Sequence, residues 1–144
     1  MLKQIDPLLG PELLATLRAM GHGDDIVIAD ANFPAASAGR PLIRLDGIDA
    51  PRIAEAILSV MPLDDFVPEC AWHMQVVGDP AAQMPIFDDF RAVLAKHGDG
   101  ASLASLERFA FYERAGKAFA IVVSGETRLY GNLLLKKGVI RPQS

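Results

Sequence analysis

The sequence predicts an α/β fold in which helices pack on both faces of a sheet. Strand-like and helix-like segments alternate over most of the 144 residues, which is the order typical of such folds. The strand-like segments are short apolar runs such as Asp25–Ala29, whereas the helix-like segments carry apolar residues three or four positions apart, as over residues 84–96. Neither a repeat nor a linker interrupts the pattern, so we expect one domain over residues 1–144.

The first half of the chain contains four expected elements. A helix over residues 11–20 begins with a proline, carries a leucine stripe and stops at Gly21. A buried strand follows over Asp25–Ala29, and a loop over 31–41 leads to a weaker strand at Leu42–Leu45. Asp49 can then cap a helix that reaches residue 60, ahead of a proline at 62.

The second half continues the alternation. We expect Ser105 to cap a fourth helix that ends at residue 117. The other expected elements are a helix over 84–96 and strands over 71–77, 118–124 and 133–135. Because ligands of such folds bind beside the carboxyl ends of strands, the residues that follow the first strand are candidates for a site.

Composition excludes several classes of function. The net charge is −4, and no basic cluster exceeds the Lys136-Lys137 pair, so nucleic acid is a poor partner. No apolar run approaches the roughly 18 residues that span a bilayer, and the first residues lack a signal-peptide core, so we expect no membrane contact. The single cysteine, Cys70, fits a reducing compartment. We therefore expect a cytoplasmic protein.

His22 is the candidate for proton transfer. It lies between Gly21 and Gly23, directly after a predicted helix end, and an unperturbed histidine titrates near about 6.5. The alternative is a surface histidine in a helix-ending turn.

Four further polar residues stand at the ends of apolar segments, and each has an alternative structural role. Asp30 can accept hydrogen bonds from sugar hydroxyls or open an Asx-turn, and Arg108 can donate to vicinal oxygens or lie solvated on a helix. Tyr130 and Asn132, two apart, would share one face of a strand, with a cross-strand pair or a turn as alternatives. Together these groups suit a small polyhydroxylated ligand.

Motifs for other chemistries are missing. The three histidines are widely separated, and no HxH, HExxH or CxxC pattern occurs, so a metal site has weak support. There is also no P-loop, GxSxG elbow or complete dinucleotide loop. We expect neither a metal nor a cofactor.

Taken together, the segments resemble the family of D-ribose pyranases and L-fucose mutarotases, and within it the fucose branch. The likeness runs from Leu2 to about Ile140 and is strongest in four ordered blocks: Met20-Gly21-His22-Gly23-Asp24, Asp30-Ala31-Asn32-Phe33-Pro34-Ala35, Arg108-Phe109-Ala110-Phe111-Tyr112-Glu113-Arg114-Ala115 and Tyr130-Gly131-Asn132. The ribose branch typically has histidine where Arg108 stands. Some fucose mutarotases have histidine where this chain has Asn32.

The resemblance implies a three-layer α/β/α sandwich with a central mixed sheet, like that of ribose pyranase. It implies that His22 is the acid/base residue and that Asp30, Arg108, Tyr130 and Asn132 contact the sugar. It also implies a homo-oligomer, in similar bacterial proteins a ring of ten subunits, with each site bordered by a neighbour.

The expected activity is interconversion of the α and β anomers of L-fucose by acid/base ring opening and reclosure. Two alternatives stay open. The chain can instead interconvert pyranose and furanose forms of D-ribose, or it can be a non-catalytic monosaccharide-binding accessory of sugar uptake.

Overall fold

Six strands form one mixed sheet through the middle of the protein. The computed structural model describes residues 1–143, so the last residue of the expected domain, Ser144, lies outside the described residues. The sheet order is β2-β5-β1-β6-β3-β4. The strands are β1 (Asp25–Ala29), β2 (Leu42–Leu45), β3 (Ala71–Met74), β4 (Ala104–Leu106), β5 (Ala120–Ser124) and β6 (Leu133–Lys136).

Strand direction gives the sheet two distinct ends. β1 and β2 each pair parallel with β5, and β3 pairs parallel with β4. β6 lies antiparallel between β1 and β3. The carboxyl ends of β1 to β5 therefore meet the start of β6 at one end of the sheet, which we call the carboxyl end. The other we call the amino end.

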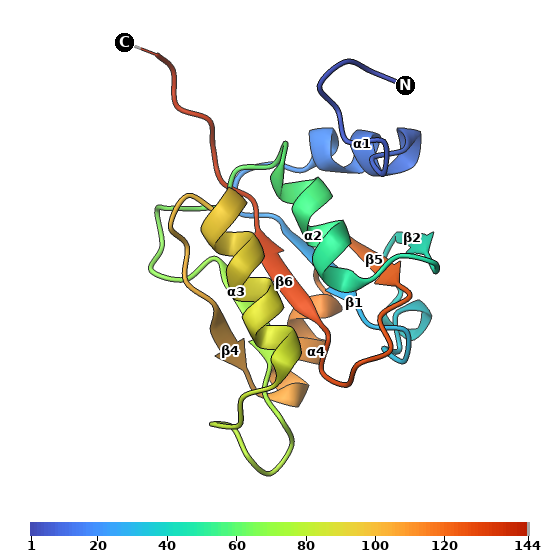
Figure 1. The fold of residues 1–144 in the computed structure, drawn as a ribbon, viewed down its shortest axis with the longest axis vertical. Helices are drawn as coiled ribbons and strands as arrows, with labels where there is room; N and C mark the ends of the chain where they lie inside the picture. The colour runs from blue at the N-terminus through green and yellow to red at the C-terminus, as the bar shows by residue number, and fades with distance from the viewer. Residues whose placement is uncertain (144) are drawn as a thin grey trace.

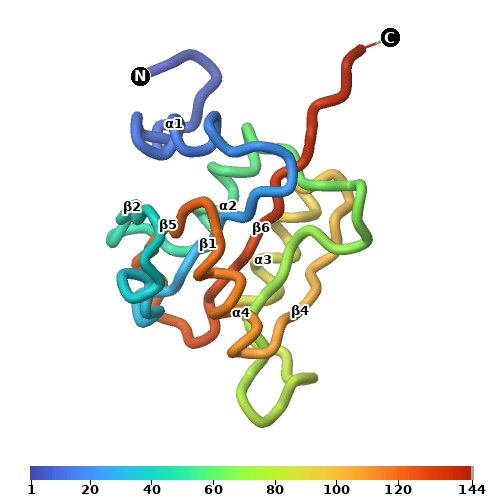
Figure 2. The backbone as a smooth tube through the Cα atoms, turned by 180° about the vertical axis from the view of Figure 1, so that it is seen from behind, coloured from blue at the N-terminus to red at the C-terminus, as the bar shows by residue number. Residues whose placement is uncertain are grey.

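Helices cover both faces of this sheet, as the sequence predicts. Helices α1 (Pro11–Ala19), α2 (Ala50–Leu58) and α3 (Pro85–His97) share one core, and α4 (Arg108–Ala115) packs on the opposite face. Figure 1 shows α2 and α3 in front of the sheet, and Figure 2 shows α4 from behind. Side chains along β1 alternate between the two cores: Ile26 and Ile28 pack in the first, and Val27 packs in the second. The three-layer α/β/α prediction is confirmed.

The predicted helices and strands are present, and their bounds match the prediction or differ from it by at most three residues. The Asp49 cap is confirmed, because its Oδ1 accepts the Arg52 N–H at 2.8 Å. The Ser105 cap is wrong, since Ser105 lies in the edge strand β4, which the sequence did not predict. Helix α4 instead begins at Arg108, and the Glu107 carboxylate accepts the first free N–H groups.

Two other predictions about strands need correction. The strand predicted to reach residue 77 ends at Met74, and the chain turns between Val76 and Asp79. Tyr130 and Asn132 lie in the turn before β6 rather than on a strand, so the turn alternative is the correct one. Within residues 1–143 no helix is both long and apolar enough to cross a membrane.

Candidate functional site

A polar cavity of about 230 Å³ opens at the carboxyl end of the sheet. It brings together four of the five predicted site residues, which come from segments far apart in the sequence: Asp30, Arg108, Tyr130 and Asn132. The remaining lining residues are Asn32, Phe33, Pro34, Met74, Val77, Tyr112 and Leu129. Strand direction explains the convergence, because Asp30 follows β1, Arg108 follows β4 and Asn132 precedes β6.

Asp30 and Asn132 form a reciprocal pair at the base of this cavity. The Asp30 N–H donates to Asn132 Oδ1 at 2.8 Å, and Asn132 Nδ2 donates to Asp30 Oδ2 at 3.1 Å. Both residues are buried. The side chain of Asn132 therefore fixes both the backbone and the carboxylate of Asp30, so the carboxylate faces the cavity in one orientation.

Asp30 also opens an Asx-turn, the alternative that its sequence context suggested. Its Oδ1 accepts the Asn32 N–H at 2.9 Å. Burial raises the pKa of the Asp30 carboxyl, and the hydrogen bonds from Asn32 and Asn132 oppose that shift only in part. A carboxyl with a raised pKa can take up and return a proton more readily at neutral pH than an exposed one.

The turn before β6 has an unusual backbone that presents Tyr130 to the cavity. Tyr130 has φ of 62°, a left-handed conformation that only a minority of non-glycine residues adopt. Its hydroxyl oxygen accepts the Val77 N–H at 3.1 Å, which leaves the hydroxyl hydrogen free for a ligand. Gly131 is required beside it, because a Cβ there would lie 2.7 Å from the Glu126 side chain.

An ion pair between the exposed Arg128 and the buried Glu126 anchors the same turn. Arg128 binds both carboxylate oxygens of Glu126 at 3.1 Å and reaches Asp89 of α3 at 2.6 Å. Burial would raise the pKa of Glu126, but the Arg128 guanidinium holds it below its ordinary value. The segment between β5 and β6 is thereby tied to α3.

Arg108 enters the cavity from the first turn of α4. Its Cζ lies 4.4 Å from the centre of the Phe109 ring. Its Nε is buried, and no residue within 1–143 accepts its hydrogen. Because a buried donor without an acceptor costs about 1–3 kcal/mol, this nitrogen is poised to donate to a ligand oxygen.

Aromatic and aliphatic side chains form the rest of the lining. The Phe33 ring packs edge-on against Tyr112 with centroids 5.5 Å apart. Met74 and Leu129 complete an apolar surface around the opening. A cavity lined by both hydrogen-bonding and apolar groups can bind the hydroxyls and the C–H face of one sugar ring.

His22 lies at the amino end of the sheet, away from this cavity. Figure 1 shows the segment between α1 and β1 at the upper end of the sheet and the turn between β5 and β6 at the lower end. The five residues of β1 separate the two, which corresponds to about 16 Å of strand. His22 Nε2 instead lies 3.0 Å from Asp64 Oδ1. Sequence reasoning missed Asp64, whose partner is 42 positions away.

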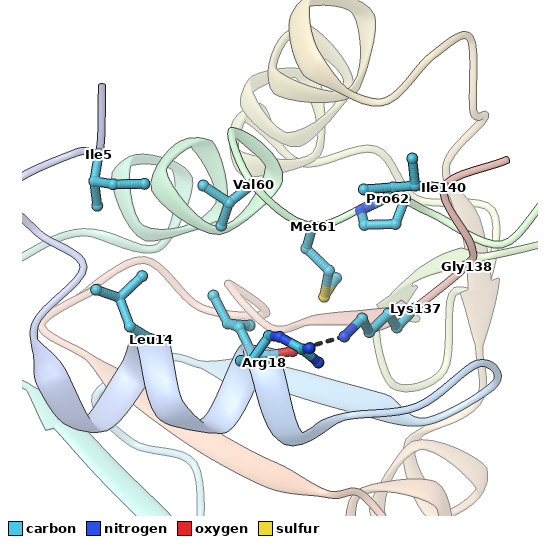
Figure 3. Close-up of a pocket in the computed structure, with 10 residues that line it drawn as sticks. Ile5, Leu14, Arg18, Val60, Met61, Pro62, Lys137, Gly138 and Ile140 are labelled. Atoms are coloured by element: carbon cyan, nitrogen blue, oxygen red, sulfur yellow. Dashed lines mark hydrogen bonds between the residues drawn. The ribbon is translucent and has the colours of Figure 1, made fainter. Parts of the chain in front are cut away.

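A larger cavity of about 380 Å³ lies between α1 and the segment that follows β6, and it lacks comparable polar convergence. Figure 3 shows its lining, which is mostly apolar. Two cations line it, Arg18 and Lys137, and the Lys137 Nζ donates to the carbonyl oxygens of Leu17 and Met20 at 2.7 and 2.6 Å. This lysine satisfies carbonyl groups at the end of α1. Among residues 1–143 no three side chains come together that could hold a metal ion.

The fold and the cavity define a protein built to hold a small polyhydroxylated ligand. The chain matches the RbsD / FucU transport protein family over residues 3–140, and it belongs to that family.

The chain is similar to three proteins of known name over nearly its whole length. It is 48% identical to the fucose mutarotase of Homo sapiens, over 96% of this chain and 94% of that one. It is 45% identical, with a TM-score of 0.88, to the fucose mutarotase of Streptococcus pneumoniae solved in complex with L-fucose, over 97% of this chain and all of that one. Bacillus subtilis RbsD complexed with D-ribose is 23% identical with a TM-score of 0.76, covering 98% of this chain and 100% of that one, so it shares the fold alone.

Proposed function

We propose that the protein is an isomerase that interconverts the α and β anomers of L-fucose. The observation that carries this proposal is the convergence of Asp30, Arg108 and Tyr130 on one sugar-sized cavity, in a chain 45% identical to a fucose mutarotase that binds L-fucose. Arginine at position 108 is the residue that the resemblance associates with the fucose branch.

The reaction needs a base and an acid on either side of the anomeric carbon. The base takes the proton of the anomeric hydroxyl while the acid protonates the ring oxygen. The bond between the anomeric carbon and the ring oxygen then breaks, with its electron pair remaining on that oxygen. Rotation about the bond next to the aldehyde carbon and reclosure give the other anomer, and both protons return. A positioned acid or base typically contributes about a hundredfold to ten-thousandfold.

The cavity residues divide this work. Arg108 Nε, buried without an acceptor, donates to a sugar oxygen, and Asp30 accepts a hydroxyl hydrogen. The free hydroxyl hydrogen of Tyr130 is available for proton transfer to the ring. Asn132 reaches the sugar chiefly through Asp30, whose orientation it fixes.

His22 reaches the sugar from a second copy of the chain. Since β1 separates His22 from the cavity by about 16 Å within one subunit, a single chain cannot bring both to one ring. A head-to-tail contact that joins the amino end of one sheet to the carboxyl end of the next completes the site. Such contacts form a ring when the rotation between neighbouring subunits closes. We propose a homo-oligomer of this kind, with the ring of ten subunits that the resemblance implies.

The proposal also covers the domain organisation and the location of the protein. We propose that the chain acts as one domain, since the sheet recruits strands from residues 25 to 136. We also propose a cytoplasmic location, since Cys70 is buried as a free thiol.

Saturation transfer in proton NMR tests the activity. Irradiating the α anomeric signal of L-fucose should reduce the β signal only when the protein is present, and D-ribose should respond weakly. Exchange with ribose alone would assign the protein to the pyranase alternative. Binding of fucose in calorimetry without exchange would assign it to the non-catalytic alternative.

Complementation between inactive variants tests the shared site. His22→Ala and Arg108→Ala should each lose exchange while folding normally. When the two are unfolded together and reassembled, sites that pair an intact His22 with an intact Arg108 should restore about a quarter of wild-type exchange, if subunits mix randomly and contribute one residue each. No recovery in the mixture would place both residues in one subunit, whereas near-normal exchange by His22→Ala on its own would remove His22 from the mechanism.

A further inference from the structure

Asp64 is a buried carboxylate with no place in the cavity described above. Its side chain is only 4% exposed, although it lies in an irregular segment between α2 and β3. Burying a carboxylate is costly unless it is hydrogen-bonded and paired. Its partners are the His22 ring at 3.0 Å and the Phe66 N–H at 3.1 Å, both at Oδ1. The Phe66 contact stabilises the loop itself, whereas the His22 contact joins Asp64 to a residue 42 positions away.

His22 depends on such a partner, because its own backbone gives it little support. It stands between two glycines, and Gly23 has φ of 87°. The His22 side chain is 43% exposed, and the Phe66 ring tilts against it with centroids 5.0 Å apart. Asp64 and Phe66 therefore hold the ring at two points, one by a hydrogen bond and one by an apolar contact.

The loop that carries His22 and the loop that carries Asp64 both bind the backbone at the end of β6. The Gly23 N–H donates to Lys137 O at 2.8 Å, and the Asp64 N–H donates to Lys136 O at 3.0 Å. Gly138 lets this stretch approach the Asp64 loop, since a Cβ there would lie 2.3 Å from Leu63 O. The relative placement of His22 and Asp64 is thus fixed by the sheet.

The chemistry of the contact selects one ring nitrogen. A carboxylate only accepts hydrogen bonds when ionised, so His22 Nε2 must carry a hydrogen. Burial would raise the pKa of Asp64, but the hydrogen bonds from Phe66 and His22 hold it below its ordinary value, so it is ionised at neutral pH. Nδ1 is then the nitrogen left for proton exchange. The positive charge that the ring acquires on taking a proton faces the Asp64 carboxylate.

We propose that Asp64 is a positioning residue for anomer exchange, orienting His22 through Nε2 so that Nδ1 faces the sugar of the neighbouring subunit. The proposal rests on the proposed function for the reaction. It concerns a residue that does not touch the sugar and acts only through the histidine.

The test compares Asp64→Ala with Asp65→Ala. Asp65 is the matched control, because it is adjacent, carries the same charge and pairs with Arg141 rather than with His22. For Asp64→Ala the kcat for fucose exchange should fall at least about tenfold with KM within about twofold, since proton transfer is lost but sugar contacts are kept. Asp65→Ala should stay within about twofold in both. An Asp64→Ala variant with wild-type kcat, or with kcat and KM changed alike, would overturn the proposal.

A spectroscopic readout separates positioning from loop structure. In protein with ¹⁵N-labelled histidine, the Nε2–H proton of His22, assigned by its absence in His22→Ala, should lie downfield in the wild type and in Asp65→Ala. It should move upfield or vanish in Asp64→Ala. An unchanged signal would overturn the proposal, and this comparison remains decisive even if the wild-type protein exchanges no fucose.

Asp64→Asn covers the case in which the alanine variant does not assemble. Asparagine keeps an oxygen for the Phe66 N–H, so the loop retains its hydrogen bond. Because a neutral oxygen accepts more weakly than a carboxylate, kcat and the proton shift should lie between those of wild type and the Asp64→Ala expectation. Wild-type values of both in Asp64→Asn would contradict the role assigned to the charge.

Discussion

At the scale of single residues, the geometry of the cavity depends on Asn132, whose amide oxygen and amide nitrogen both bind Asp30. Asn132 Oδ1 accepts from the Asp30 backbone, and Nδ2 donates to the Asp30 carboxylate. Because Asp30 is buried, its N–H and its Oδ2 would lose these hydrogen-bond partners without Asn132. We infer that Asn132 supports the geometry of Asp30 as much as it contacts sugar.

Replacing Asn132 by alanine should therefore affect stability and activity together. Asn132→Ala leaves the Asp30 N–H without its acceptor, which should lower the free energy of unfolding by about 1–3 kcal/mol and slow fucose exchange. Urea denaturation and NMR exchange measure the two effects.

Asn32→Ala is the matched control for that change. Asn32 lines the same cavity but binds Asp30 through its backbone N–H, which alanine retains. Its free energy of unfolding should stay within about 0.5 kcal/mol of wild type. Equal stability losses in both variants would contradict a supporting role specific to Asn132.

The sequence predicted four residues of the cavity but did not predict Asp64 as the partner of His22. Four site residues could be predicted because each stands at the end of an apolar run: Asp30, Arg108, Tyr130 and Asn132. Asp64 stands beside Asp65, and no local signal distinguishes them, yet their side chains are 4% and 60% exposed. Which of two adjacent carboxylates is buried depends on a contact 42 positions distant, which a single sequence does not reveal.

At the scale of elements, the N-terminal segment before α1 is tied to α2 by a two-pronged ion pair. Arg52 Nη1 and Nη2 each donate to one Asp6 oxygen at 2.8 Å. The Arg52 guanidinium holds the pKa of Asp6 below its ordinary value of 3.8, and the Leu8 N–H adds to this. The pair joins two segments that are 46 positions apart.

The stability that this pair contributes should depend on pH. Because the pKa of Asp6 is lower in the folded state than in the unfolded state, the contribution is present above about 3.8 and is lost as pH falls through the lowered value. Asp6→Asn should cost about 0.5 kcal/mol at pH 7, as expected for a partly exposed pair. Urea midpoints at pH 7 and in acid check this: a difference that persists unchanged in strong acid would exclude the ion pair as its source.

Elements with a clear apolar period were predictable, whereas those set by pairing were not. The leucine stripe of α1 and the β-branched run of β1 identify themselves. Strand β4 has three residues of intermediate burial at the sheet edge, and only its pairing with β3 makes it a strand. That short strand also displaces the start of α4 from Ser105 to Arg108, which sets where the arginine enters the cavity.

At the scale of the whole molecule, large apolar side chains lie exposed at both ends of the sheet. Phe66 is 61% exposed beside His22, whereas Phe109 and Leu129 are each 63% exposed around the cavity. Exposed apolar patches beside polar sites are typical of protein interfaces. In the proposed head-to-tail assembly these two patches face one another, so one contact both buries apolar surface and brings His22 to the sugar.

A charge placed on that surface should separate the subunits. Leu129→Asp should give smaller species in sedimentation and lose fucose exchange, since the carboxylate would be buried in the contact. Ala92→Asp, on the exposed side of α3, adds the same charge elsewhere and should leave size and exchange unchanged. An active Leu129→Asp protein of single-chain size would contradict the shared site.

The antiparallel strand β6 has a consequence for how the protein is made. It is the last strand to be synthesised, yet it lies in the middle of the sheet, hydrogen-bonded to β1 and β3. Until it emerges, the chain holds two separate fragments, β2-β5-β1 and β3-β4, each with an open edge that invites mispairing. The turn that carries Tyr130 and Asn132 leads directly into this strand. Closing the sheet and assembling the cavity are therefore the same folding event.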